Sequence, residues 1–245
     1  MSLLSCTGLV VGYAKSRNVS ETGLIAPFDF ELHSGEVVAL LGENGCGKST
    51  LLKTFAGMIP PLKGIVTLSK NESWTARERA KFVALVRMGY LANVSLDRMT
   101  VREFVGLGRT PYVGLFDGHS AEDERVVDEA LKLLELENYA SRWVSELSDG
   151  ERSRVFLAMA VAQQVKVLLL DEPNAFLDIP HSHRLFRTLK KMAAEREMGI
   201  IVSTHSVEYA ERYSDRMMVI AGGRARVAAT QDARANGLLD WTEIC

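Results

Sequence analysis

A glycine-rich run at residues 42–49, Gly-Glu-Asn-Gly-Cys-Gly-Lys-Ser, places the strongest constraint on how this chain folds. It fits the pattern Gly-x4-Gly-Lys-Ser/Thr, which binds phosphate where it joins the end of a strand to the start of a helix. The flanking residues meet that condition, because 36–41 are typical of a buried strand and 49–58 carry apolar residues at helical spacing. Pro60 and Pro61 would stop this helix. The run therefore predicts a strand, a phosphate-binding loop and a helix.

The chemistry of such a loop assigns roles to its residues. Glycines let successive backbone N–H groups converge on one anion, and the following helix directs its positive end to the same point. We expect Lys48 to bridge the β- and γ-phosphates of a nucleotide, Ser49 to ligate Mg²⁺ and Thr50 to reach the α-phosphate. The predicted nucleotide-binding residues of this segment are Gly42, Asn44, Gly45, Cys46, Gly47, Lys48, Ser49 and Thr50. The alternative is a glycine-rich helix start that binds nothing.

A second candidate site follows the apolar run at residues 167–170, Val-Leu-Leu-Leu, which reads as a strand buried on both faces. Two carboxylates, Asp171 and Glu172, come directly after it. Because ligands bind at the carboxyl ends of parallel strands, we expect Asp171 to hold Mg²⁺ and Glu172 to act as general base toward the attacking water. An isolated Asp-Glu pair is more often a solvated turn, and the phosphate loop is what favours the catalytic interpretation.

A histidine completes the set of predicted catalytic residues, which are Lys48, Glu172 and His205. His205 follows the apolar strand pattern at 200–204, so it too should lie on the ligand side of the sheet. There it could contact the γ-phosphate and orient Glu172. A lone histidine is more often a polar surface or capping residue.

Strand and helix patterns alternate through most of the chain. Strand patterns lie at 3–11, 65–68, 82–86, 167–170, 200–203 and 217–220, and helical patterns at 76–81, 122–136, 183–196 and 207–213. This alternation predicts an α/β fold whose parallel sheet is covered on both faces. From about 88 to 164 the patterns are helical, which predicts a helical subdomain inserted between segments 1–87 and 165–245 of one domain, 1–245.

Bulk composition narrows the possible partners. The 245 residues include 29 basic and 31 acidic side chains, so the chain lacks the basic excess that nucleic-acid backbones attract. Three cysteines are too few for a disulfide framework, and no apolar run approaches the ~20 residues of a membrane span. The first residues do not have the pattern of an export signal. The sequence predicts a cytoplasmic protein without a nucleic-acid partner.

The segment at residues 147–151, Leu-Ser-Asp-Gly-Glu, precedes a long apolar helical pattern. Ser148 with Glu151 three residues later is a capping box, which predicts a helix beginning here whatever the function.

Taken together and in this order, these motifs resemble the ATP-binding cassette (ABC) family. The resemblance joins the phosphate loop, a variant of the family signature Leu-Ser-Gly-Gly-Gln at 147–151, the acidic strand end, Leu177-Asp178 and His205, and it covers essentially the full chain. It implies an α/β P-loop NTPase core with an N-terminal antiparallel β part and an inserted α-helical subdomain. It also implies an ATPase that uses ATP and Mg²⁺.

The resemblance further implies a homodimer of ATPase subunits. Two copies would pack head to tail, with each ATP held between one phosphate loop and the partner's signature helix. Ser148 and Gly150 would then face the γ-phosphate across the interface, and Asp178 would lie along it. Tyr13 would stack on adenine, although a lone tyrosine equally suits a core position.

Two positions depart from the family pattern. Asp149 stands where the signature has glycine, and its charge would repel phosphate unless the side chain turns away. The family also has a glutamine just after the strand that matches 82–86, whereas this chain has none between Lys48 and Ser148. Three nearby residues could take its place, and the sequence does not choose between them: Arg87, Met88 and Asn93.

Residues 100–116 resemble the helical subdomain of ATPases that serve importers of iron siderophores, haem and vitamin B12 (cobalamin). This implies polytopic membrane permease subunits as partners, an extracytoplasmic solute-binding protein as an indirect partner, and a peripheral place on the inner face of the cell membrane. The apolar residues here could equally be plain core. The alternative functions are a soluble ABC-class ATPase in macromolecular assembly or repair, an exporter subunit, and a GTPase or small-molecule kinase that shares only the phosphate loop.

Overall fold

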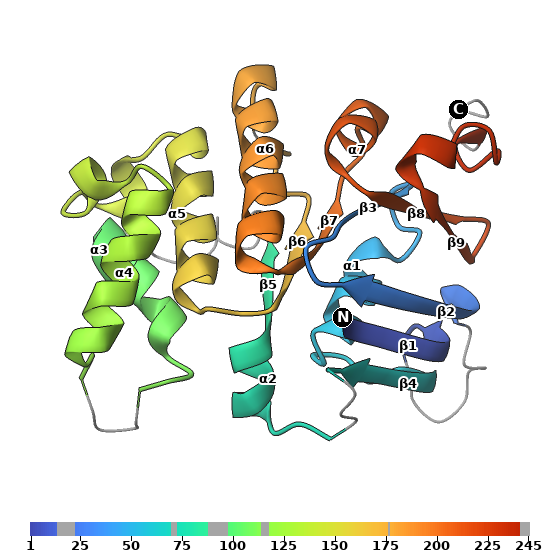
Figure 1. Cartoon of the computed structure of the whole chain (residues 1–245), viewed down its shortest axis with the longest axis horizontal. Helices are drawn as coiled ribbons and strands as arrows, with labels where there is room; N and C mark the ends of the chain where they lie inside the picture. The colour runs from blue at the N-terminus through green and yellow to red at the C-terminus, as the bar shows by residue number, and fades with distance from the viewer. Residues whose placement is uncertain (14–22, 70–72, 88–97, 114–117, 176, 241–245) are drawn as a thin grey trace.

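A computed structural model describes residues 1–13, 23–69, 73–87, 98–113, 118–175 and 177–240 of the chain. Its strands form a six-stranded sheet in the order β5-β6-β7-β3-β8-β9 and a three-stranded sheet in the order β2-β1-β4. Helices α3, α4 and α5 gather at one end of the molecule and the three-stranded sheet lies near the other (Figure 1). The larger sheet consists of β3 (Val37–Gly42), β5 (Val83–Arg87), β6 (Val167–Asp171), β7 (Gly199–Ser203), β8 (Arg216–Ala221) and β9 (Arg224–Ala229).

In the larger sheet, β5, β6, β7, β3 and β8 run parallel, and β9 pairs antiparallel with β8. Every residue of β3, β6 and β7 is buried, as strands covered on both faces require. Parallel strands end at one edge of their sheet. The last residues of β5, β6, β7 and β3 therefore lie along a common edge: Arg87, Asp171, Ser203 and Gly42.

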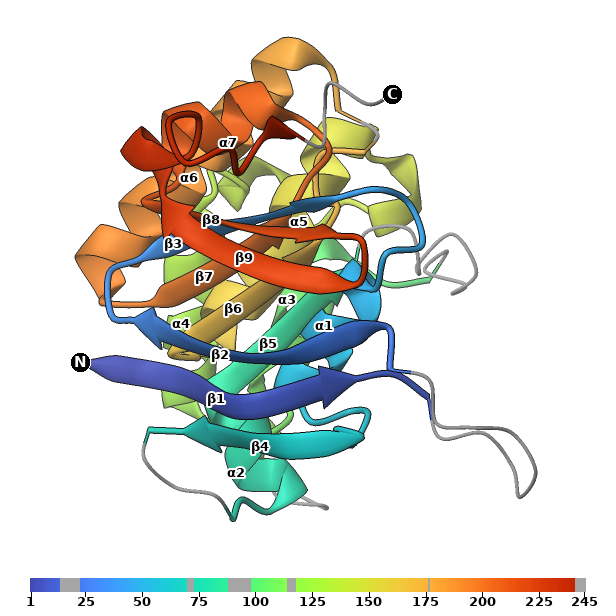
Figure 2. The same cartoon turned by 90° about the vertical axis from the view of Figure 1, so that its right-hand side faces the viewer.

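The smaller sheet is antiparallel and pairs β1 (Ser2–Val11) with β2 (Ile25–His33) on one side and β4 (Lys63–Leu68) on the other (Figure 2). Its apolar face shares a buried cluster with α1 (Lys48–Phe55), in which the rings of Phe30 and Phe55 stack at 6.0 Å. This sheet confirms the N-terminal antiparallel part that the family resemblance implied.

Among the described residues, the segment between β5 and β6 holds α3 (Val101–Gly106), α4 (Ala121–Leu133) and α5 (Asp149–Ala162), with short 3-10 turns between them. Phe104 of α3 meets Phe156 of α5 edge to face, with 4.8 Å between the ring centroids. The same buried cluster continues into β5, β6 and α6 (Ile179–Arg196), so these helices do not have a separate core. None of the helices in the described residues has both the length and the apolar content needed to cross a bilayer.

Several boundaries differ from the sequence predictions. Helix α1 ends at Phe55, ahead of the prolines, because the N–H groups of Gly57 and Met58 turn back onto the carbonyls of Thr54 and Lys53. Helix α6 begins at Ile179, since the Asp178 side chain caps it there.

The sequence patterns also left some strands and helix ends unpredicted or misplaced. Phe82 ends α2 (Ala76–Phe82) and does not start β5, while α7 (Val207–Tyr213) has the predicted range. Strands β2 and β9 are not among the predicted strands, although residues 28–33 of β2 alternate between apolar and polar. Pro27 and Asp29 disfavour a strand on propensity, and β2 tolerates them as the edge strand of its sheet. Strand β9 is short, carries two arginines and follows Gly223.

A buried ion pair ties the helices of this region together. Arg109 donates from Nε to Asp123 Oδ1 at 2.8 Å and from Nη1 to the carbonyl of Ala162 at 2.7 Å. Asp123 also closes the capping box of α4 with Ser120. Hydrogen bonds from the hydroxyl and backbone N–H of Ser120, together with the Arg109 guanidinium, lower the pKa of Asp123 from 3.8 to about 2.

Replacement of this carboxylate, Asp123→Asn, should flatten the pH dependence of stability in acid. Because the folded-state pKa lies below the unfolded one, Asp123 stabilises the native state above about pH 4. That stabilisation is lost as the pH falls toward 2. Urea unfolding from pH 6 to pH 2 measures the slope. Asp128→Asn, at an exposed carboxylate paired with Arg102, is the control and should keep the wild-type slope. Equal slopes in wild type and D123N would contradict the prediction.

Candidate active site

The loop of residues 43–47 joins β3 to α1, as its sequence pattern predicts. Gly47 precedes α1 and has a φ of +111°. No side chain caps the first turn of α1, so the free backbone N–H groups of that turn remain available on the side of the loop. A Cβ on Gly42 would lie 2.5 Å from the carbonyl oxygen of Ile220 and 2.8 Å from Cys46 Sγ. Only glycine fits at this end of β3.

Lys48 is buried, and its ammonium folds back over the loop. Nζ donates to the carbonyls of Gly42 at 2.7 Å and Glu43 at 3.0 Å, which places the positive charge inside the loop. Asn44 and Gly45 are exposed at the loop tip, and Ser49 is partly exposed in the first turn of α1.

Tyr13 lies beside the same helix. Thr50 donates from its hydroxyl to Tyr13 Oη at 3.2 Å, and 52% of Tyr13 is exposed. The structure therefore brings this aromatic ring next to α1 while leaving much of it open to solvent.

One hydroxyl organises the acidic strand end. Ser203, fully buried at the end of β7, donates to Asp171 Oδ1 at 3.0 Å and accepts from the backbone N–H of Glu172 at 2.8 Å. Asp171 is buried, with 5% of it exposed. Sequence reasoning missed Ser203, although its place at the end of a strand next to β6 was a usable signal.

Glu172 and His205 are in direct contact. His205 Nε2 lies 2.7 Å from Glu172 Oε1, and both side chains are partly exposed. Glu172 adopts φ +50°, a left-handed conformation that is uncommon for a residue with a side chain. The carboxylate thus comes from a strained backbone position held by its neighbours.

Arg87 occupies the neighbourhood where the sequence left the family's glutamine unassigned. It ends β5, pairs in register with Asp171, and its Nε lies 3.3 Å from Asp171 Oδ2. Met88 and Asn93 lie outside the described residues.

The signature segment forms the start of α5 and confirms the predicted capping box. Ser148 accepts from the N–H of Glu151 at 3.4 Å, and the carboxylate of Glu151 accepts from the N–H of Ser148 at 2.8 Å. The latter bond lowers the pKa of Glu151. Asp149 is exposed, and its Oδ1 lies 3.9 Å from Arg152 Nη1, so its charge is directed along the helix toward a cation.

Gly150 and Asp178 meet through His181. Asp178 caps α6 by accepting from the His181 N–H at 2.9 Å and contacts the ring Nδ1 at 2.6 Å. These two hydrogen bonds, that of the backbone N–H first, lower the pKa of Asp178. A Cβ on Gly150 would lie 3.0 Å from His181 Cδ2. The start of α5 and the start of α6 are therefore packed against each other.

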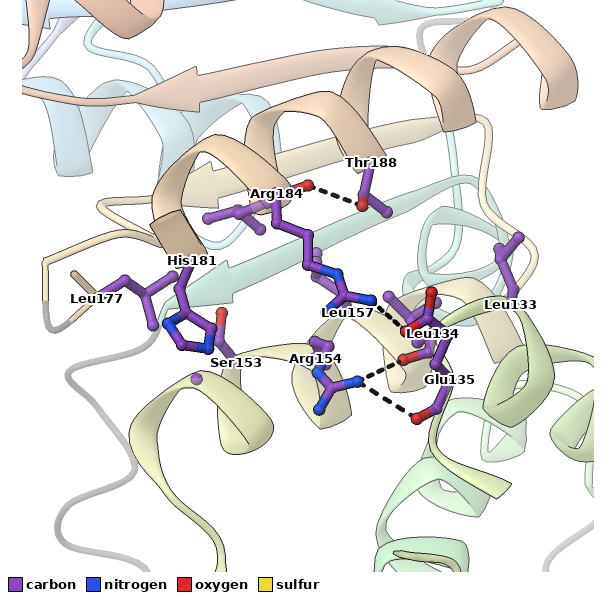
Figure 3. Close-up of a pocket in the computed structure, with 12 residues that line it drawn as sticks. Leu133, Leu134, Glu135, Ser153, Arg154, Leu157, Leu177, His181, Arg184 and Thr188 are labelled. Carbon is purple, nitrogen blue, oxygen red and sulfur yellow. Dashed lines mark hydrogen bonds and ion pairs between the residues drawn. The ribbon is translucent and has the colours of Figure 1, made fainter. Parts of the chain in front are cut away.

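A pocket continues between these two helices (Figure 3). At its far side Arg184 of α6 forms an ion pair with Glu135, and Arg154 of α5 donates to the carbonyls of Leu134 and Glu135 at 3.2 and 3.3 Å. Ser153 lines the pocket. The Arg184–Glu135 ion pair thus connects α6 to the helical segment at the edge of a pocket that is lined largely by leucines.

The signature helix does not meet the phosphate loop within one chain. Figure 1 shows α6 and β6 between α5 and α1 along the long axis of the molecule. The structure therefore brings Lys48, Asp171, Glu172 and His205 to the loop side of the sheet, and it leaves Ser148, Gly150 and Asp178 in a second group.

The donor set of the first group suits a hard cation. In the described residues no cluster of three or more His, Cys, Asp or Glu side chains could hold a metal. Asp171 and the Ser49 hydroxyl offer oxygen ligands, which fits Mg²⁺ because this ion takes few protein ligands and completes its shell with phosphates and water.

A phosphate-binding loop after one parallel strand, with paired carboxylates at the end of another, defines a P-loop nucleoside triphosphatase. The sequence model of the ABC transporter family matches residues 25–175, and this chain belongs to that family. It is thus an ATP-binding and ATP-hydrolysing subunit of an ABC transporter.

Individual relatives agree with this membership. The achromobactin transport ATP-binding protein of Dickeya dadantii is 36% identical over 96% of this chain and 84% of its own length. The petrobactin import ATP-binding protein of Bacillus anthracis is 37% identical over 84% of this chain and 75% of its own. Haemin, iron(3+)-hydroxamate and cobalamin import ATP-binding proteins are further relatives. A solved ATP binding subunit of an ABC transporter is 27% identical, with a TM-score of 0.78, and covers 99% of this chain and 98% of its own.

Removal of the shared hydroxyl, Ser203→Ala, should lower the free energy of unfolding by about 1–3 kcal/mol, because the N–H of Glu172 loses its acceptor in a water-poor site. Urea unfolding measures the change. Ser34→Ala removes an exposed hydroxyl that donates to the Glu197 carbonyl, and it should cost about 0.5 kcal/mol or less. Equal losses in the two variants would show that the Ser203 bridge adds nothing.

Proposed function

We propose that this chain powers an importer of iron-siderophore, haem or cobalamin type, and that the residues gathered at the loop side of the sheet carry out ATP hydrolysis. The import activities named for its relatives support the solute class. The observation that carries the catalytic assignment is the contact of Glu172 with His205 next to Asp171, at the edge where the phosphate loop begins.

In this proposal Lys48 and the N–H groups of the loop bind the β- and γ-phosphates, and the half-exposed ring of Tyr13 stacks on adenine. Asp171 and Ser49 hold Mg²⁺, whose chemical contribution is to neutralise the charge that develops on the phosphate oxygens. Glu172 accepts a proton from the attacking water. His205 fixes the Glu172 carboxylate by its 2.7 Å contact and reaches the γ-phosphate.

A homodimer completes the site. Ser148 is exposed at the start of the 14-residue helix α5, and α6 and β6 lie between α5 and α1 (Figure 1). A second copy could present this helix start, with Ser148 and Gly150, to the γ-phosphate. Asp178 is exposed next to His181 and Gly150, so it would lie along the same interface.

The helical segment is the part that contacts the membrane subunits in this proposal. We assign residues 1–87 and 165–245 to the nucleotide-binding core and about 88–164 to the helical signature subdomain. Leu107 and Trp143 expose 45% and 43% of their surface there, which suits contact with a polytopic permease. The ATPase would then lie peripherally on the inner face of the membrane, and a solute-binding protein would act outside it.

Replacement of the proposed base, Glu172→Gln, should lower the rate of ATP hydrolysis by about 10²–10⁴-fold while ATP binding persists. ATP should then hold the variant as a dimer, because the ATP enclosed between the two subunits is not hydrolysed. Phosphate release, calorimetry and light scattering measure the three properties. Lys48→Ala should abolish binding, and Glu208→Gln, at an exposed carboxylate on α7, should behave as wild type. A Glu172→Gln protein with a normal rate would refute the assignment.

Capture of partners tests the transporter assignment. Tagged Glu172→Gln protein, added with ATP to solubilised native membranes, should co-purify with a polytopic permease, and the Lys48→Ala variant should retain less of it. Mass spectrometry identifies the recovered chains. Recovery of soluble proteins alone would favour the alternative of a soluble ABC-class ATPase in assembly or repair.

A further inference from the structure

The carboxylate assigned to the metal already has a cationic neighbour. Arg87 Nε lies 3.3 Å from Asp171 Oδ2, while Ser203 donates to the other oxygen, Oδ1. Both oxygens of Asp171 therefore have a partner from a neighbouring strand, the guanidinium from β5 and the hydroxyl from β7.

Strand pairing fixes the position of Arg87. The register of β5 on β6 runs from Val83 opposite Val167 to Arg87 opposite Asp171. A slip of one residue would turn the buried side chains of β5 to the wrong face, so this register is strongly determined. The pairing therefore fixes the backbone of Arg87 opposite that of Asp171, within reach of the carboxylate.

The two members of the pair differ in their freedom to move. The Asp171 side chain is 5% exposed, whereas the Arg87 side chain is 41% exposed. Asp171 is therefore enclosed by its surroundings, whereas the Arg87 side chain borders solvent.

A guanidinium at this distance opposes a second cation. Its charge cancels most of the field of a single carboxylate, so Asp171 attracts Mg²⁺ less strongly. Each carboxylate oxygen has two lone pairs, so the metal can still be accommodated, but it must share Asp171 with Arg87 or displace it.

We propose that Arg87 competes with Mg²⁺ for Asp171 and so weakens the coupling between metal binding and ATP binding at this site. The proposal rests on the ATP and Mg²⁺ site of the proposed function. Arg87 is here a positioning residue, since it acts on the metal through Asp171.

The test compares ATP affinity with and without metal by calorimetry, in the Glu172→Gln background so that ATP is not consumed. The measured quantity is the ratio of the ATP dissociation constant in EDTA to that in Mg²⁺, which reports coupling between the two ligands and not turnover. Arg87→Gln should raise this ratio about tenfold, equivalent to about 1.4 kcal/mol. Arg87→Lys keeps the charge and should keep the ratio of the background protein.

A matched control separates this effect from the general loss of an arginine. Arg102 is 40% exposed and pairs with Glu124 and Asp128 in the helical segment, so Arg102→Gln should leave the ratio unchanged. If Arg87→Gln does not fold, Arg87→Met keeps the aliphatic stem without the charge, and the same increase is expected.

The outcomes distinguish failure of the competition at Asp171 from failure of the proposed function. An unchanged or lower ratio in the uncharged variants, with ATP binding intact, would overturn the competition while leaving the proposed function in place. A background protein that binds no ATP in either condition would overturn the proposed function, and the inference with it.

Discussion

At the end of β7 a single serine hydroxyl, that of Ser203, bonds to two consecutive residues. These are Asp171, the last residue of β6, and Glu172, the first residue after it. The hydrogen bonds of Ser203 to Asp171 and to the N–H of Glu172 require that β6 and β7 end at the same level. That condition is met because both strands are buried on both faces, so any other register would misplace many apolar side chains. The arrangement of the carboxylates is thus a consequence of the core.

The features that could be predicted from the sequence are those written in short, local patterns. The phosphate loop, the run before Asp171 and the capping box at Ser148 each depend on residues a few positions apart, and each forms the predicted element. Strands β2 and β9 are not predicted. Residues 28–33 of β2 alternate between apolar and polar, but Pro27 and Asp29 disfavour a strand, and β9 consists mainly of alanine and arginine. Both strands are defined by pairing with distant residues. The contact of Arg87 with Asp171 likewise depends on a register across residues far apart in sequence. The catalytic roles of Glu172, His205 and Lys48 and the nucleotide-binding role of Ser148 stay predictions.

The helical segment has two kinds of attachment to the rest of the chain. Its apolar side chains belong to the same buried cluster as β6 and α6, while its polar contacts, such as that of Arg184 with Glu135, lie around the pocket beside α6. The apolar contacts are non-directional, whereas the polar ones are partly exposed and cost little to exchange. The buried apolar contacts therefore contribute most of the stability of this attachment, and the exposed ion pair contributes little.

The backbone of Glu172 has a consequence for stability. At φ +50° a residue with a side chain is strained, and glycine would adopt this conformation freely. A glycine there would relieve the strain but would remove the carboxylate that meets His205. The fold therefore keeps this carboxylate at some cost in backbone energy, and selection for thermal robustness alone would favour the loss of the proposed base.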